Sequence, residues 1–128
     1  MKEVIFTEKA TRPTSLYSQA VRAGNTVYLA GACGDDPATG EIMGGGDMAV
    51  EAKYALENLR LTLEAAGGTM NDLVMVHVYV NDLEKLPAFN QVYATYFTGG
   101  YLPARIAMQV VKFSGGANLE LDAVAVLD

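Results

Sequence analysis

The sequence predicts a single α+β domain over residues 1–128, with a six-stranded mixed sheet and two helices on one face. Of its 128 residues 51% are hydrophobic, enough for one continuous core in a chain too short for a second domain. The periodicity of its apolar residues predicts elements in the order β-β-β-α-β-α-β-β. This order combines strand-helix-strand connections with hairpins, which a mixed sheet accommodates.

Three strands are predicted in the first part of the chain. Residues Lys2 to Thr7 alternate weakly and are typical of an edge strand. Strands at Gln19–Arg22 and Thr26–Ala30 are joined by Ala23-Gly24-Asn25, a short loop suited to a hairpin. Residues 34–46 are predicted to form a loop, because they contain turn-favouring pairs and three consecutive glycines.

Two helices follow the first strands. Asp47 is the expected N-cap of a long helix whose apolar residues recur at three- and four-residue intervals as far as Ala66. A second helix is predicted to start near Pro87, a residue suited to a first turn, and to end at Gly99-Gly100. The side chains off the apolar stripe of the first helix, which we expect to face solvent, are Glu51, Glu57, Arg60 and Glu64.

The remaining strands are predicted at Leu73–Val80, Ala104–Lys112 and Asn118–Leu127. The first of these is nearly all β-branched or aromatic, which indicates a strand covered on both faces. With both helices on one face of the sheet, the other face shows valine and aromatic side chains to water. Such a patch is larger than a monomer usually tolerates, so we expect self-association to cover it.

Composition excludes several classes of protein. The net charge is −6 and the nine Lys and Arg residues are scattered, so nucleic acid is not an expected partner. The chain has no long apolar run and no secretory signal at its start, so we expect a cytoplasmic location without membrane contact. Its one cysteine, Cys33, has no partner for a disulfide or a zinc site, and we interpret it as a packing residue.

Several short motifs, spread in order over the whole chain, resemble the Rid (YjgF-like) family. They are Tyr17-Ser18-Gln19-Ala20, residues 25–31, residues 78–83, Asn90-Gln91-Val92-Tyr93, Pro103-Ala104-Arg105 and residues 120–125. The resemblance implies a chorismate-mutase-like fold, a homotrimer and three clefts between neighbouring subunits. In the catalytic members these clefts hydrolyse reactive 2-aminoacrylate-type enamines and imines to 2-keto acids and ammonia. It implies no metal and no organic cofactor.

The resemblance assigns the chemistry to Arg105 and Glu120. Arg105 would clamp the substrate carboxylate, because a guanidinium offers two parallel donors and stays protonated; a surface arginine paired with an acidic side chain is the alternative. Glu120 would assist the attacking water, and partial burial between two leucines would raise its pKa. If the last two strands formed a simple hairpin, these residues would lie about 20 Å apart. Either the strands are not neighbours, or the residues meet across a subunit boundary.

Four further residues are candidates for substrate binding. The resemblance implies Tyr17 as a wall of the cleft, Asn90 as a hydrogen-bond partner, and the backbones of Gly31 and Ala107 as ligand contacts. From the residues alone, Tyr17 equally fits an aromatic that seals a loop, and Asn90 fits a helix cap. We interpret His77 as a hydrogen-bonded packing or interface histidine, since no acidic residue accompanies it at triad spacing.

The chain departs from the family at Ala30, Ala32 and Ala107, where relatives often carry polar side chains. This change favours a more apolar pocket and leaves two other functions open. One is a deaminase or hydrolase of a specific catabolic intermediate, such as an aminomuconate or an aminoacrylate peracid. The other is a non-catalytic regulator that binds a 2-keto acid. The endoribonuclease activity attached to the family's name is not favoured, because the chain has neither a basic stripe nor a His/His or His/Glu pair.

Overall fold

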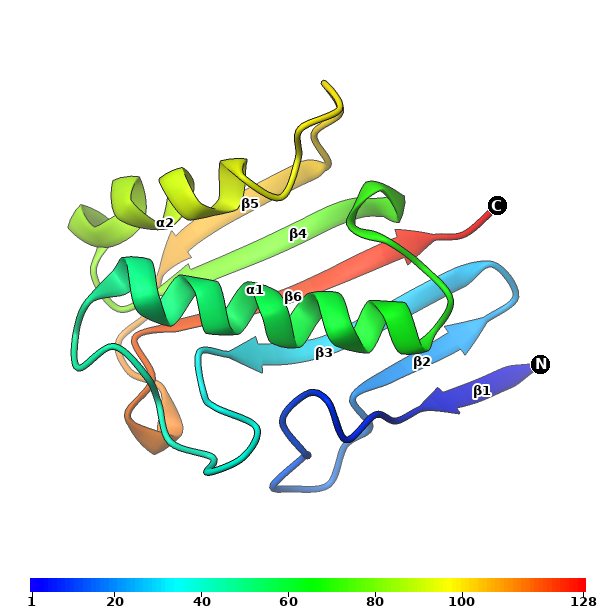
Figure 1. Cartoon of the computed structure of the whole chain (residues 1–128), viewed down its shortest axis with the longest axis horizontal. Helices are drawn as coiled ribbons and strands as arrows, with labels where there is room; N and C mark the ends of the chain where they lie inside the picture. Colours follow the sequence, from blue (N-terminus) through cyan, green and yellow to red (C-terminus); the bar gives the residue numbers. More distant parts are fainter.

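The computed structural model describes residues 1–128 and contains one six-stranded sheet with two helices on the same face (Figure 1). The strand order is β1-β2-β3-β6-β4-β5, and every pair is antiparallel except β4 with β5. This confirms the predicted fold class. The elements are β1 (Lys2–Ile5), β2 (Ala20–Ala23), β3 (Thr26–Cys33), α1 (Met48–Ala65), β4 (Leu73–Val80), α2 (Leu86–Ala94), β5 (Ala104–Gln109) and β6 (Leu119–Val126).

Helix α1 begins where the sequence predicts. The Asp47 carboxylate accepts a hydrogen bond from the backbone N–H of Ala49, at 3.0 Å. The prediction for Glu51 is wrong, because this side chain is fully buried. Its carboxylate accepts hydrogen bonds from the backbone N–H and the side-chain amide of Asn118, at 2.7 and 2.8 Å. These bonds compensate a buried charge at the point where the first turn of α1 meets the start of β6.

Helix α2 has Pro87 in its first turn, as predicted, but ends at Ala94, before the predicted Gly99-Gly100. Beyond it the Thr95 hydroxyl donates to the Val92 carbonyl at 2.6 Å, a side-chain bond that competes with continuation of the helix. Asn90 lies in the second turn of α2. The interpretation of Asn90 as a helix cap is therefore wrong.

Successive side chains of each strand point to opposite sides of the sheet, so the sheet has one face covered by the helices and one open face. On the covered face, under the helices, Val76, Val78 and Leu121 are fully buried. The exposed apolar side chains of the open face include Tyr28, Ile106, Met108 and Val126. The predicted open apolar face is therefore present in the chain, and the expectation that β4 is covered on both faces is not met within one chain.

A bulge in β4 changes one predicted orientation. The register between β4 and β6 shifts between Leu73 and Met75. Val74 is consequently exposed instead of sharing the buried side with Val76.

None of the helices combines the length and the apolar character that a membrane crossing requires.

Strands β5 and β6 are not neighbours, because β4 lies between them. Arg105 of β5 stands opposite Val76, and Glu120 of β6 stands opposite Tyr79. The last two strands therefore do not form the simple hairpin considered from the sequence. Strand β6 instead pairs with both β3 and β4 at the centre of the sheet.

Candidate functional site

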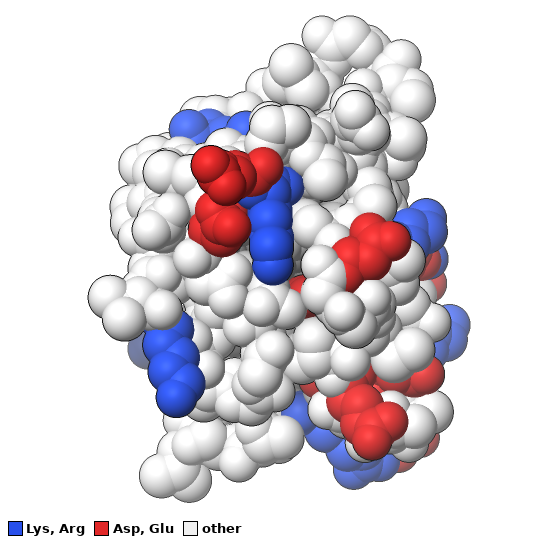
Figure 2. Space-filling view, turned by 90° about the vertical axis from the view of Figure 1, so that its left-hand side faces the viewer, with Lys and Arg blue, Asp and Glu red and all other residues white.

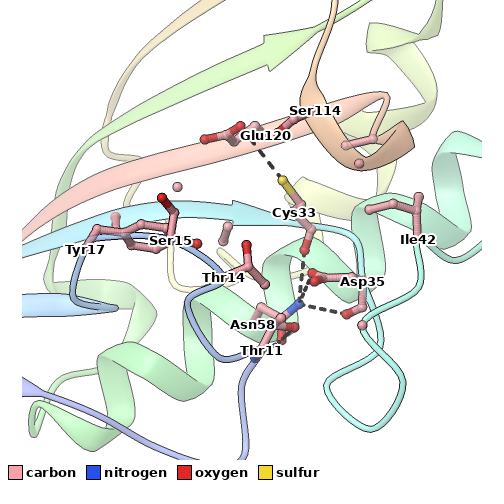
Figure 3. Close-up of a pocket in the computed structure, with 16 residues that line it drawn as sticks. Thr11, Thr14, Ser15, Tyr17, Cys33, Asp35, Ile42, Asn58, Ser114 and Glu120 are labelled. Atoms are coloured by element: carbon pink, nitrogen blue, oxygen red, sulfur yellow. Dashed lines mark hydrogen bonds between the residues drawn. The ribbon is translucent and has the colours of Figure 1, made fainter.

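An open cavity of about 470 Å³ lies along the second half of β3 (Figure 3). Strand β2 pairs only with residues 26–29 of β3, so residues 30–33 have a strand partner on one side only, from β6. Parts of the segments 11–17, 33–42 and 114–117 line the space beside this edge. Three of the predicted site residues, Tyr17, Gly31 and Glu120, line the same cavity.

A bulge in β3 brings the Glu120 carboxylate against Gly31. Leu29 pairs with Ala123 and Ala32 pairs with Leu121, so two residues of β3 stand against one of β6. A Cβ atom at position 31 would lie 2.0 Å from Glu120 Oε2. Glycine at this position therefore makes room for the carboxylate, and the space that the sequence assigned to a ligand is taken by Glu120 in the isolated chain.

Cys33 lies beside the same carboxylate. Its thiol donates a hydrogen bond to Glu120 Oε1, at a sulfur–oxygen distance of 3.8 Å. Burial, with help from the charge of Glu120, raises the pKa of Cys33 to about 12. The thiol stays protonated at neutral pH and is not a nucleophile. The sequence predicted a packing residue, whereas the structure places Cys33 in the lining of the cavity.

The protonation of Glu120 follows from its surroundings. Burial raises the pKa of Glu120 above its usual value, and the charge of Asp122 adds to this effect, while the Cys33 thiol opposes it. The direction expected from the flanking leucines is confirmed. A carboxyl group with a raised pKa is suited to accepting and returning a proton near neutral pH.

Asn58 of α1 holds the wall of the cavity together, as Figure 3 shows. Its amide nitrogen donates to the backbone carbonyls of Cys33 and Asp35, at 3.0 and 2.9 Å. Its amide oxygen accepts from the backbone N–H of Thr11, at 3.2 Å. Asn58 therefore joins three segments that are distant in the sequence. The sequence analysis gave this residue no role; the available signal was an amide next to the apolar stripe of α1.

Arg105 lies on the edge strand β5, away from the cavity. Its guanidinium carbon is 4.9 Å from the ring centre of Tyr93 and 5.9 Å from that of Phe89, both on α2. It forms no ion pair with a carboxylate of its own chain. The alternative of a surface arginine paired with an acidic side chain is therefore wrong within the chain. The guanidinium is oriented by aromatic rings and remains available to an external anion.

Ala107 and Asn90 lie on the same side of the sheet as Arg105. Ala107 packs against the core under α2, two residues beyond Arg105 along β5. The side-chain oxygen of Asn90 is buried without a hydrogen-bond partner, and so is the hydroxyl of Tyr93, the ring that Arg105 contacts. Buried polar atoms without partners are uncommon in folded proteins, and these two lie on a single helix.

His77 is hydrogen-bonded, as predicted, but its partner was missed. Its Nδ1 lies 2.6 Å from Asp122 Oδ1, and the Tyr79 hydroxyl donates to Asp122 Oδ2 at 3.0 Å. These three side chains form a network on the open face. Asp122 is 45 residues away in the sequence, and only the register between β4 and β6 places it opposite His77.

Comparison with known proteins identifies the family. The family model described as Endoribonuclease L-PSP, which represents the Rid family, matches residues 7–127. The chain belongs to the Rid family. It is 45% identical over 125 residues to a RutC family protein of Pyrococcus horikoshii, with 98% of each chain covered. It is 41% identical to the 2-iminobutanoate/2-iminopropanoate deaminase of Mus musculus, covering 98% of this chain and 92% of that protein.

The same relationship holds in three dimensions. The crystal structure of TdcF from E. coli with bound serine matches with a TM-score of 0.93 at 30% identity, covering 98% of this chain and 99% of TdcF. The predicted Rid resemblance and its fold are thereby confirmed. At the level of the family, the Rid relatives of this chain include imine deaminases.

In this Rid chain the predicted site residues fall into two groups. Tyr17, Gly31 and Glu120 meet at the cavity, whereas Arg105 lies with Ala107 and Asn90 near α2. Glu120 alternates with buried leucines of β6 and so points away from the helices, while Arg105 points toward them. Strand β4 lies between Arg105 on β5 and Glu120 on β6. Along the strand direction these two residues are about 10 Å apart. Within one chain Arg105 and Glu120 cannot act on the same small molecule.

Proposed function

We propose that this Rid protein hydrolyses 2-aminoacrylate-type enamines and their imine tautomers to 2-keto acids and ammonia, in clefts between the subunits of a homotrimer. The observation that carries the proposal is the Arg105 guanidinium, which is held over an aromatic ring without a carboxylate partner. A fixed, unpaired cation is suited to a substrate that carries a carboxylate. The deaminase name of the mouse relative supports the same reaction.

Association supplies what one chain lacks. Arg105 and Glu120 lie on opposite faces of the sheet, so a shared cleft requires Arg105 from one copy and Glu120 from its neighbour. The open face carries exposed apolar side chains such as Tyr28, Ile106 and Val126, whose burial favours association. A contact between two different surfaces of the same chain gives a ring when the rotation between copies closes, and a trimer is one such ring.

The proposed reaction uses one water molecule. Arg105 binds the substrate carboxylate through two parallel hydrogen bonds and so orients the imine carbon. Glu120 accepts a proton from water while the water oxygen bonds to that carbon, and it passes this proton to the imine nitrogen, which gives a tetrahedral carbinolamine. Glu120 then takes the proton of the new hydroxyl group and gives it to the amino group, as the keto group forms and the C–N bond breaks. Ammonia and a 2-keto acid are the products.

Cleavage of RNA is not proposed, although the family model carries an endoribonuclease name. The net charge of −6 repels a polyanion. On the face shown in Figure 2, acidic and basic side chains are interspersed and the basic ones do not gather into a stripe. The cavity itself contains two carboxylates, Asp35 and Glu120, which oppose binding of phosphate.

The test is the hydrolysis of imines generated in solution by an amino-acid oxidase from alanine or 2-aminobutyrate. Wild-type protein is expected to accelerate the loss of the imine, and Arg105→Ala to lower kcat/KM by about a hundredfold, because the carboxylate clamp is removed. Arg12→Ala is the matched control, since Arg12 also lies over an aromatic ring, 5.4 Å from the centre of Phe6, but does not line the cavity. Binding of 2-keto acids without any turnover would contradict the proposal and favour a regulator.

A mixing experiment tests the shared cleft. Arg105→Ala and Glu120→Gln proteins are each expected to have about a hundredth of wild-type activity or less, and co-refolding them in equal amounts should restore about a quarter of it, because random assembly of a ring gives that share of intact clefts. The mass in solution should be three times 13.6 kDa. A monomer, or a mixture without restored activity, would contradict the shared cleft.

A further inference from the structure

The cavity extends well beyond the space that the reacting carbon needs. Figure 3 shows Glu120 and Ser114 at one end, and Asp35, Asn58 and Thr11 at the other. Its volume of about 470 Å³ falls in the range of roughly 300 to 1,000 Å³ that whole small-molecule ligands occupy. A three-carbon imine bound beside Glu120 fills only a small part of it. The remainder has room for a longer substrate side chain.

The lining of the whole cavity mixes polar and apolar residues, and its charge is one-sided. It contains two carboxylates, Asp35 and Glu120, and no lysine, arginine or histidine of this chain. An acidic side chain placed here would meet only like charges, whereas a cation or a group rich in N–H donors would find acceptors. The hydroxyl-bearing residues of the lining are Thr11, Thr14, Ser15, Tyr17 and Ser114.

Asp35 is held in a defined position at the far end. Its backbone carbonyl and its Oδ1 accept from the amide nitrogen of Asn58, at 2.9 and 3.3 Å. Asp35 also forms an isolated β-bridge with Ile42. Partial burial raises the pKa of Asp35 above its usual value. A carboxylate that is fixed and partly desolvated gains more from a cationic partner than a mobile carboxylate in water does.

We propose that Asp35 determines which substrate side chains the cavity accepts: the preferred 2-imino acids carry a cation or N–H donors at the end of an unbranched side chain, and acidic side chains are rejected. The side chain then extends from the imine carbon beside Glu120 toward Asp35. This inference rests on the proposed function, because it assigns the reacting carbon to the Glu120 end.

The test compares imines generated by an amino-acid oxidase from arginine, norleucine and glutamate, which have a cationic, a neutral and an acidic side chain. In wild-type protein kcat/KM is expected to fall in that order. Asp35→Asn should lower the ratio of arginine to norleucine about tenfold, since a charge-assisted hydrogen bond becomes a neutral one. Asparagine keeps the side-chain oxygen that accepts from Asn58, so the wall should remain folded.

Asp36→Asn is the matched control. It makes the same change of charge at the next residue, which does not line the cavity, and its Oδ1 caps a turn by accepting from Ala38, as an amide oxygen also can. The arginine-to-norleucine ratio should stay at the wild-type value. A ratio unchanged by Asp35→Asn, or lowered equally by Asp36→Asn, would overturn the assignment of Asp35.

Calorimetry separates failure of this inference from failure of the proposed function. If the protein accelerates no imine, the proposed hydrolysis fails, and the binding of the matching 2-keto acids decides the inference instead. The keto acid with a guanidinium side chain should bind more tightly than the neutral one, and Asp35→Asn should remove the difference. Equal affinities in the wild type, or no binding of either keto acid, would contradict the inference.

Discussion

The two faces of the sheet are built by the same strands, yet they differ in burial and in chemistry. On the covered face, Val78 and Leu121 are fully buried beneath the helices. On the open face, Ile106 and Val126 are 46% and 43% exposed. In β4 and β6 every polar side chain lies on the open side: His77, Tyr79, Glu120 and Asp122.

The difference separates stability from function. The covered face has the continuous apolar contacts that make a chain of this size fold. The open face combines apolar exposure with a network of titratable groups, an arrangement that is useful only beside another molecule. The proposed cleft lies where these two requirements meet, because Arg105 belongs to one face and Glu120 to the other.

The largest expected effect tests the covered face. Leu121→Ala should lower the free energy of unfolding by about 2–5 kcal/mol, because it leaves a cavity in a fully buried site. On the open face, Val126→Ala should cost about 1 kcal/mol or less in dilute protein. Urea unfolding measures both. A larger cost of Val126→Ala in concentrated protein would show that another copy covers this face; equal costs of the two substitutions in dilute protein would contradict the comparison.

The next effect concerns the point where the cavity meets the open face. Gly31→Ala should lower kcat/KM for imine hydrolysis by about a hundredfold, because the added methyl group displaces the Glu120 carboxylate. Gly99→Ala is the control, since a Cβ atom at position 99 has no neighbour within 4 Å. Wild-type activity in Gly31→Ala would mean that the position of Glu120 over Gly31 is not the active one.

The pH dependence of the free energy of unfolding should have opposite signs for Glu120 and Glu57. The raised pKa of Glu120 means that the folded chain keeps this proton where the unfolded chain has lost it, so stability falls as pH rises through that window. Glu120→Gln should therefore stabilise the protein at neutral pH and have no effect in acid. Hydrogen bonds from Arg60 lower the pKa of Glu57, so Glu57→Gln should destabilise at neutral pH, and this difference should disappear as pH falls. Urea unfolding between pH 3 and about 7 measures both signs.

The smallest effect tests the network on the open face. Asp122→Asn should lower the pKa of Glu120, because it removes a negative charge that disfavours ionisation. Titration of the Glu120 side-chain carboxyl carbon by NMR measures the shift. Glu3→Gln on the edge strand β1 should leave the titration of Glu120 unchanged. If Asp122→Asn gave no shift, the two carboxylates would not interact.

Local signals predicted much of the fold. Asp47 and Pro87 mark the starts of the two helices because capping and first-turn preferences depend on neighbouring residues alone. The strand segments and the exposed apolar face follow from alternation, which is also local. The burial of Glu51 could not be predicted in this way, because its partner Asn118 is 67 residues away.

Of the residues that line the cavity, the sequence proposed Tyr17, Gly31 and Glu120, but it did not give their arrangement and it missed Asp35 and Asn58. The family motifs pointed to Arg105 and Glu120, but their separation depends on β4 lying between β5 and β6, which no short segment encodes. The same holds for His77 with Asp122, which requires the register of two strands. The bulge at Gly31 adds one residue to β3 without any signal beyond a glycine in a strand.

Asn58 gives the cavity an unusual capacity for change. Its bond to Cys33, and the shorter of its bonds to Thr11 and to Asp35, are made with backbone atoms. Replacing the side chains at these three positions therefore leaves the wall in place. Single mutations during evolution can therefore replace one lining side chain by another and change the substrate specificity, while the fold of the sheet stays the same.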